Sequence, residues 1–160
     1  LKGNNDVYLV PAFTGLGAPY WNANARGVLS GLTRDTGPNQ IVRAIIESVA
    51  YQTYDLFEAM KHDGLRPRLV KVDGGMVMNN WFTQFLSDVV NVGVLRPKVK
   101  ETTALGAAFM AGLQIGVYKS LKDISKNWAI DKKFSPKMKN KSRSKLLQGW
   151  SQAIKRTLIT

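Results

Sequence analysis

The sequence predicts an α/β protein with a βαβα core and a C-terminal helix. Over residues 68–118, short runs rich in β-forming residues alternate with segments in which apolar residues recur every three or four positions. The connections between these segments are short, which favours a right-handed parallel unit. A length of 160 residues predicts one domain, large enough to bury a core without cross-links.

The N-terminal part is predicted to contain two strands joined by a long loop. The run VYLVPAF at 7–13 reads as an edge or terminal strand because it contains Pro11, and VLSGL at 28–32 reads as a second short strand. The intervening segment is dense in Gly, Pro and Asn, which predicts a structured loop. Its Tyr20 and Trp21 either line a ligand pocket or form a small core of the loop itself.

A long helix is predicted from Pro38 to about Lys61, where Asp63-Gly64 provides a stop signal. Glu47 lies among apolar neighbours and is interpreted as a polar group that packs the helix. The single histidine, His62, lies near the helix C-terminus without a second His or any Cys, so no histidine triad or metal centre is predicted. The apolar side of the helix is expected to consist of Ile41, Ala44, Ile45, Val49, Leu56 and Met60.

The predicted core continues with a strand at 68–75 and a helix at 79–90, which Asn79 or Asn80 caps. A strand at 92–97 follows, and then a helix at 104–116. The second helix is expected to be capped by Thr102 or Thr103, and its small residues allow a close neighbour. The inward-facing residues are expected to be Phe82, Phe85, Leu86 and Val89 in the first helix, and Leu147, Trp150, Ile154 and Leu158 in a final C-terminal helix.

The segment VDGGMVMNN at 72–80 is the strongest candidate for a binding site. Gly74 and Gly75 lack a Cβ, so a ligand can approach the backbone N–H groups, and Asn79 opens a helix whose N-terminus favours an anion. Ligands in open α/β sheets bind at the carboxyl ends of strands, where this turn falls. Asp73 either contacts a ligand or metal, or hydrogen-bonds the turn. A tight strand-to-helix connection without any ligand is the alternative.

Positive charge is concentrated in the C-terminal part of the chain. Residues 119–160 hold twelve Lys and Arg against Asp123 and Asp131, which gives +10 of the formal charge of +12. Within it, 119–145 is expected to be a basic irregular segment. Such a segment either attracts nucleic acid or is a solvated face, and its scattered lysines without interleaved aromatic residues favour the solvated face.

Composition also bounds the setting of the protein. Without cysteine there is no disulfide or thiolate zinc site, and any metal needs oxygen ligands. No apolar run is long enough to span a bilayer and no signal peptide is recognised, so a cytoplasmic location is expected. A first residue of Leu1 indicates a fragment or processed piece of a longer protein.

Four motifs occur in order along the chain, namely VPAFTGLGAPYWNANARG, GLTRDTGPNQIVRAIIESVAYQ, VDGGMVMNN and TTALGAAFMAGL. Together they closely resemble the C-terminal half of the FGGY carbohydrate kinases that phosphorylate glycerol. The resemblance covers about residues 7–118 strongly. It implies that 1–160 is a partial C-terminal ATP-binding domain of ribonuclease-H-like, actin-like ATPase fold. Such a domain binds MgATP in a cleft shared with an N-terminal kinase domain, in a cytoplasmic enzyme that self-associates.

The resemblance also implies site residues and a reaction. Gly75 would lie against the nucleotide and Asn79 would contact it, with Gly74 a weaker candidate, while TTALGAA resembles the helix that couples domain closure. The implied reaction moves the γ-phosphoryl group of ATP to glycerol and gives glycerol 3-phosphate, a chemistry of positioning and charge stabilisation. A related FGGY kinase acting on another polyol or sugar is the alternative.

Several parts that the family requires are not found in this sequence. The resemblance places the catalytic aspartate in a Gly-Asp-Gln context, which does not occur here, and it places the Thr-Gly phosphate loops and the glycerol-holding Arg-Glu pair in preceding segments. We therefore expect no catalytic residue and no metal ligand in this chain, and no activity from the chain alone. Asn22 and Ala23 also depart from the Asp-Pro that is usual in the family.

Overall fold

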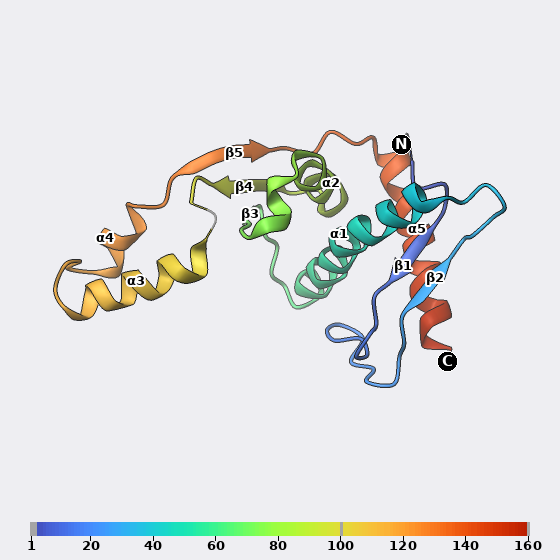
Figure 1. The fold of residues 1–160 in the computed structure, drawn as a ribbon, viewed down its shortest axis with the longest axis horizontal. Coiled ribbons are helices and arrows are strands. Elements are labelled where there is room, and N and C mark those ends of the chain that lie inside the picture. The colour runs from blue at the N-terminus through green and yellow to red at the C-terminus, as the bar shows by residue number, and fades with distance from the viewer. Residues whose placement is uncertain (1–2, 100, 160) are drawn as a thin grey trace.

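A computed structural model describes residues 3–99 and 101–159 of the chain, as a mixed α/β structure (Figure 1). Two small sheets are present, one with the order β1-β2 and one with the order β3-β4-β5. The described elements are β1 (Tyr8–Val10), β2 (Val28–Ser30), α1 (Pro38–His62), β3 (Leu69–Lys71), the 3₁₀ helix η1 (Gly75–Met78), α2 (Asn80–Val90), β4 (Gly93–Pro97), α3 (Thr102–Gln114), α4 (Leu121–Ser125), β5 (Ile130–Phe134) and α5 (Asn140–Leu158).

The two predicted N-terminal strands are confirmed, although both are shorter than expected. β1 and β2 pair antiparallel, with Tyr8 opposite Ser30. β1 is buried along its length except for a half-buried Leu9, because it packs against both α1 and α5. This packing anchors the N-terminal segment to the helical layer.

Helix α1 begins and ends where the sequence predicts, but its buried face is different. Pro38 starts the helix, Gln40 Oε1 accepts from the Gly37 N–H at 3.1 Å, and Gly64 follows the end with a positive φ of 87°. Of the expected apolar side, Ala44 is buried, Ile41 is half-buried, and Ile45, Val49, Leu56 and Met60 are 37–46% exposed. The buried face consists of Ala44, Glu47, Ser48, Ala50, Tyr51 and Phe57.

The predicted parallel βαβ unit is confirmed. β3 and β4 pair in parallel with Leu69 opposite Gly93, and α2 connects them. The four residues expected to face inward from α2, namely Phe82, Phe85, Leu86 and Val89, are all buried. β3 ends at Lys71, so the glycines that follow belong to the turn rather than to the strand.

Helix α3 extends with α4 away from the α1–α2 pair (Figure 1). It begins at Thr102, and Glu101 occupies the cap position, so the prediction of a Thr102 or Thr103 cap is wrong. Gly112 is its buried residue, because the ring of Tyr118 lies against it, and Phe109 packs edge-on to the same ring at 5.5 Å. The described neighbour of Gly112 is thus the turn that follows the helix.

The region 119–145 is more regular than the sequence predicts. It contains α4, and β5 adds antiparallel to β4 with Val94 opposite Phe134. The chain then returns along β1 as α5, in which Trp150 and Ile154 are buried, Leu147 is half-buried and Leu158 is exposed. The sequence does not indicate β5, because the side chains of this strand are exposed up to Phe134.

The aromatic core that joins these elements is centred on Tyr51 of α1. Its ring stacks on Trp150 of α5 with 5.3 Å between centroids, meets Phe85 of α2 edge-on at 5.7 Å, and lies 5.8 Å from Tyr8 of β1. Aromatic contacts of this kind contribute about 0.5–1.5 kcal/mol each beyond area burial. The core therefore fixes α2 against α1, and with it the turn that precedes α2.

None of the described helices combines the length and the apolar character that spanning a bilayer requires.

Candidate functional site

The turn between β3 and α2 places its two glycines in different environments. Gly74 has φ 88° and ψ 175°, a conformation that is essentially restricted to glycine. Gly75 has an ordinary φ and opens the 3₁₀ helix. A Cβ built on Gly75 would meet no atom within 4 Å. The backbone therefore requires a glycine at position 74 but not at position 75, and the open space at both positions leaves room for a ligand to reach the backbone.

Of the two asparagines that the sequence offers as a cap, Asn79 forms the N-cap of α2. Its Oδ1 accepts from the Trp81 N–H at 3.0 Å and from the Phe82 N–H at 3.3 Å, and its own N–H donates to Met76 O at 3.2 Å. The Nδ2 end of the same amide carries two N–H donors, which suit an acceptor on a ligand. Both predicted site residues, Gly75 and Asn79, are exposed on this one turn.

Arg96, for which the sequence predicts no role, hydrogen-bonds the turn from the adjacent strand. Arg96 of β4 is 7% exposed and donates from Nη1 to Val77 O at 2.8 Å and to Asn80 Oδ1 at 3.0 Å. Its Nε donates to Asp131 Oδ2 of β5 at 2.7 Å. An arginine inside an otherwise apolar strand, VGVLRP, was the available sequence signal, since buried charges need partners.

The carboxyl ends of β3 and β4 border a cavity of about 160 Å³. Asp73, which follows β3, and Thr102, which starts α3, both line it, together with Lys71, Val72, Pro97 and Trp128. Lys71 Nζ lies 4.0 Å from the centroid of the Trp128 ring, a cation–π contact that closes one side. Gly75 and Asn79 are not part of this lining, so the structure brings Asp73 to the cavity and the two predicted contacts to the outer turn.

The loop at 14–27 divides its two aromatic residues. Tyr20 packs against the main core, and burial raises the pKa of its hydroxyl. Trp21 is 79% exposed. Neither alternative from the sequence therefore holds for the pair, because Tyr20 joins the domain core and Trp21 projects into solvent.

Glu47 is a structural group, as the sequence analysis interpreted it. It is fully buried, accepts from Arg43 Nε at 2.6 Å and from Tyr51 Oη at 3.0 Å, and burial raises the pKa of its carboxyl. His62 lies at the exposed end of α1, 3.8 Å from Asp63. Among the described residues, no group of three or more His, Cys, Asp or Glu is placed to hold a metal ion.

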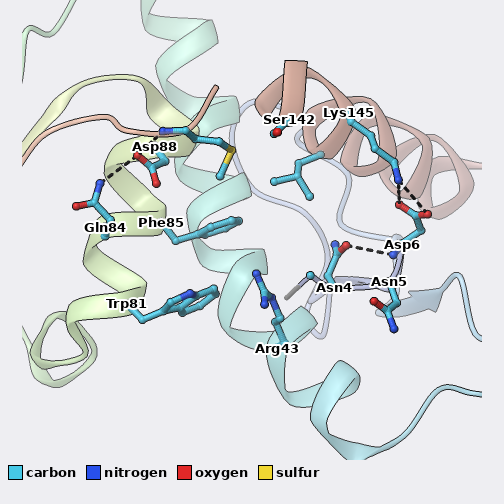
Figure 2. A pocket seen from close by; sticks show the side chains of 13 residues that line it. Asn4, Asn5, Asp6, Arg43, Trp81, Gln84, Phe85, Asp88, Ser142 and Lys145 are labelled. Carbon is cyan, nitrogen blue, oxygen red and sulfur yellow. Dashed lines mark hydrogen bonds and ion pairs between the residues drawn. The ribbon is translucent and has the colours of Figure 1, made fainter. Parts of the chain in front are cut away.

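A larger cavity of about 450 Å³ lies between the N-terminal segment, α1, α2 and α5 (Figure 2). Trp81 and Phe85 stack along one wall at 5.2 Å, and Arg43 lies 4.8 Å from the Trp81 ring centroid. The charged groups here already have protein partners: Lys145 pairs with Asp6 at 3.3 Å, and Asp88 accepts from Gln84 and from the N–H groups of Lys137 and Met138. The charged side chains around this cavity therefore link the elements that line it.

Comparison with known proteins gives a consistent result. The FGGY family of carbohydrate kinases, C-terminal domain, matches residues 2–115. Glycerol kinase 1 of Pseudomonas aeruginosa is 56% identical over 153 residues, which is 96% of this chain and 31% of that protein. The chain thus spans about a third of the length of this relative.

Two solved structures show the same arrangement. The Plasmodium falciparum glycerol kinase with ADP superposes with a TM-score of 0.85 at 38% identity, over 100% of this chain and 32% of that one. The gluconate kinase from Lactobacillus acidophilus has a TM-score of 0.73 at 26% identity, over 96% of this chain and 31% of that one. These likenesses confirm the expected α/β fold of ribonuclease-H-like, actin-like type, as a C-terminal part. The chain belongs to the FGGY family of carbohydrate kinases.

Proposed function

We propose that this chain is the ATP-binding C-terminal part of a kinase that transfers the γ-phosphoryl group of ATP to glycerol and gives glycerol 3-phosphate. The observation that carries the proposal is the exposed turn that presents Gly75 and Asn79 ahead of α2 in a member of this kinase family. The glycerol kinase relatives, one of them solved with ADP, support the nucleotide and the acceptor.

The turn fits the adenosine side of ATP by its chemistry. Gly75 has no side chain, and no protein atom lies within 4 Å of the place where a Cβ would stand. A flat ligand can therefore approach the backbone at this position. Asn79 keeps α2 capped through Oδ1 and offers Nδ2 as a donor. The N-terminus of α2 adds a positive field that favours a polar or anionic group nearby.

The remaining parts of the reaction are assigned to other segments of the whole kinase. Mg²⁺ binds readily to the phosphates of ATP with few protein ligands, and the N-terminal domain would supply the acceptor site and the catalytic base. This chain would position the nucleotide, and phosphoryl transfer depends chiefly on such positioning. We propose a cytoplasmic enzyme that self-associates and whose isolated C-terminal part is inactive.

The proposal is tested by measuring ATP affinity in the parent kinase with two variants. Gly75→Val places a branched side chain in the ligand space, and Asn79→Asp keeps a helix cap while removing both N–H donors. We expect both to weaken ATP binding about tenfold or more, equivalent to about 1.4 kcal/mol. Gly17→Val is the matched control, because a Cβ at this exposed loop glycine also meets no atom within 4 Å. Unchanged affinity in both variants would show that the site is misplaced.

Acceptor specificity separates the proposal from the related alternative. The gluconate kinase likeness shows that other acceptors occur on this fold, but its identity of 26% is below the 38% of the glycerol kinase. We expect a coupled assay on the parent kinase to give a higher kcat/KM for glycerol than for xylulose or gluconate. The reverse order would assign the chain to a sugar or sugar-acid kinase.

A further inference from the structure

The turn that carries Gly75 and Asn79 has few contacts of its own. From 73 to 80, Val77 is the buried residue and the other side chains are exposed. The hydrogen bonds within an exposed 3₁₀ turn are weak, so the position of this turn depends on contacts with the rest of the protein. Two side chains supply such contacts. Thr83 of α2 donates from Oγ1 to Val77 O at 2.9 Å and to Asn79 O at 3.1 Å, and Arg96 contacts it from β4.

The contacts of Arg96 are directed chiefly at the turn rather than at the sheet. Nη1 lies within 2.8 Å of Val77 O, 3.0 Å of Asn80 Oδ1 and 3.4 Å of Met78 O, so the acceptors come from both sides of Asn79. Nε pairs with Asp131 across to β5, and the guanidinium lies 5.5 Å from the Phe134 ring. If Arg96 served only to join β4 to β5, the Asp131 pair would suffice.

The geometry points to Arg96 as a positioning residue for nucleotide binding, which fixes the Val77–Asn80 backbone so that Gly75 and Asn79 face the ligand correctly. This inference rests on the proposed nucleotide site. Arginine suits the role because its rigid fork reaches the turn and Asp131 at the same time. A lysine has one compact ammonium and cannot hold both groups in fixed geometry.

The test compares Arg96→Lys and Asn80→Ala in the parent kinase with Arg66→Lys, an exposed arginine, as the matched control. Asn80→Ala removes one acceptor of Arg96 at an exposed position and leaves the buried charge in place, so it remains informative if Arg96→Lys folds poorly. We expect Arg96→Lys to raise the KM for ATP and the Kd for ADP about tenfold while the KM for glycerol changes by less than about twofold. Asn80→Ala should show the same selective change to a smaller degree.

The failure of this inference is distinguishable from failure of the site itself. If Gly75→Val weakens ADP binding but Arg96→Lys and Asn80→Ala lower only the melting temperature, or raise both KM values equally, Arg96 is a structural residue and the inference is overturned. If Gly75→Val and Asn79→Asp leave ADP binding unchanged, the proposed site is wrong and the inference fails with it. A selective nucleotide defect in folded Asn80→Ala supports the positioning role.

Discussion

Adjacent glycines in the turn should respond oppositely to the same substitution. Gly74→Ala forces a residue with a Cβ into φ 88° and ψ 175°, a conformation that is essentially restricted to glycine. The substitution should lower the free energy of unfolding by about 1–3 kcal/mol. Gly75→Ala meets no atom and keeps an ordinary φ, so it should be neutral or stabilise by up to about 1 kcal/mol, because the unfolded chain loses freedom. A Cβ at Gly74 meets no atom within 4 Å either, so the difference comes from the backbone alone.

The expected separation between the two variants is about 2 kcal/mol, which corresponds to about 4–8 °C in Tm for a chain of this size. Urea and thermal unfolding of the 160-residue chain, followed by circular dichroism, measure it directly. Gly74→Asn is a sharper control: asparagine tolerates the left-handed helical region, but a ψ of 175° lies outside that region, so the loss should persist. Equal stability of Gly74→Ala and wild type would refute the backbone conformation on which this reasoning rests.

Asn79→Ala should lower the free energy of unfolding by about 1 kcal/mol through loss of the α2 cap, whereas Asn79→Asp should retain it, as urea titration would show. Gly149→Ala should destabilise by about 1–3 kcal/mol despite the higher helix propensity of alanine, because its Cβ would overlap the Tyr8 ring and hydroxyl; a rise in Tm would contradict this. Burial raises the pKa of Asp55 above 3.8, so its stabilising contribution is complete below that pH and is lost as pH rises through the raised pKa. The free energy of unfolding of Asp55→Asn should therefore increase more than that of wild type as the pH rises above about 4, and parallel curves would contradict this.

Local signals in the sequence predicted the parts of the fold whose causes are local. Pro38 and Asp63-Gly64 delimit α1, Asn79 caps α2, and the short connections produce the parallel βαβ unit. The helix boundaries and the cap depend on backbone chemistry within a few residues. The parallel unit follows from the order of its elements and from their short connections. The resemblance of four ordered motifs to the FGGY kinases supplied the fold family, and the comparisons confirm it.

The buried face of α1 depends on long-range contacts, which the spacing of apolar residues along the helix does not indicate. Apolar spacing favoured the side of Ile45, Val49 and Leu56, but the helix buries Glu47 and Tyr51 instead. A polar side chain can enter a core once its hydrogen-bonding groups find partners, and Arg43 and Tyr51 provide them for Glu47. Both partners lie four positions from Glu47, so the helix alone brings these groups together. The packing of Tyr51 against Phe85 and Trp150 decides that this side of the helix is buried.

The sequence alone determined that a turn with two glycines leads from a strand into a helix capped by an asparagine, because helix capping and the order of strand and helix depend on neighbouring residues. Only the tertiary structure decided which glycine the backbone requires, that β5 pairs with β4, and that Arg96 holds the turn from below. Arg96 is separated from Val77 by 19 positions and from Asp131 by 35. Contacts at such separations depend on how the strands are brought together, and no window of sequence describes that.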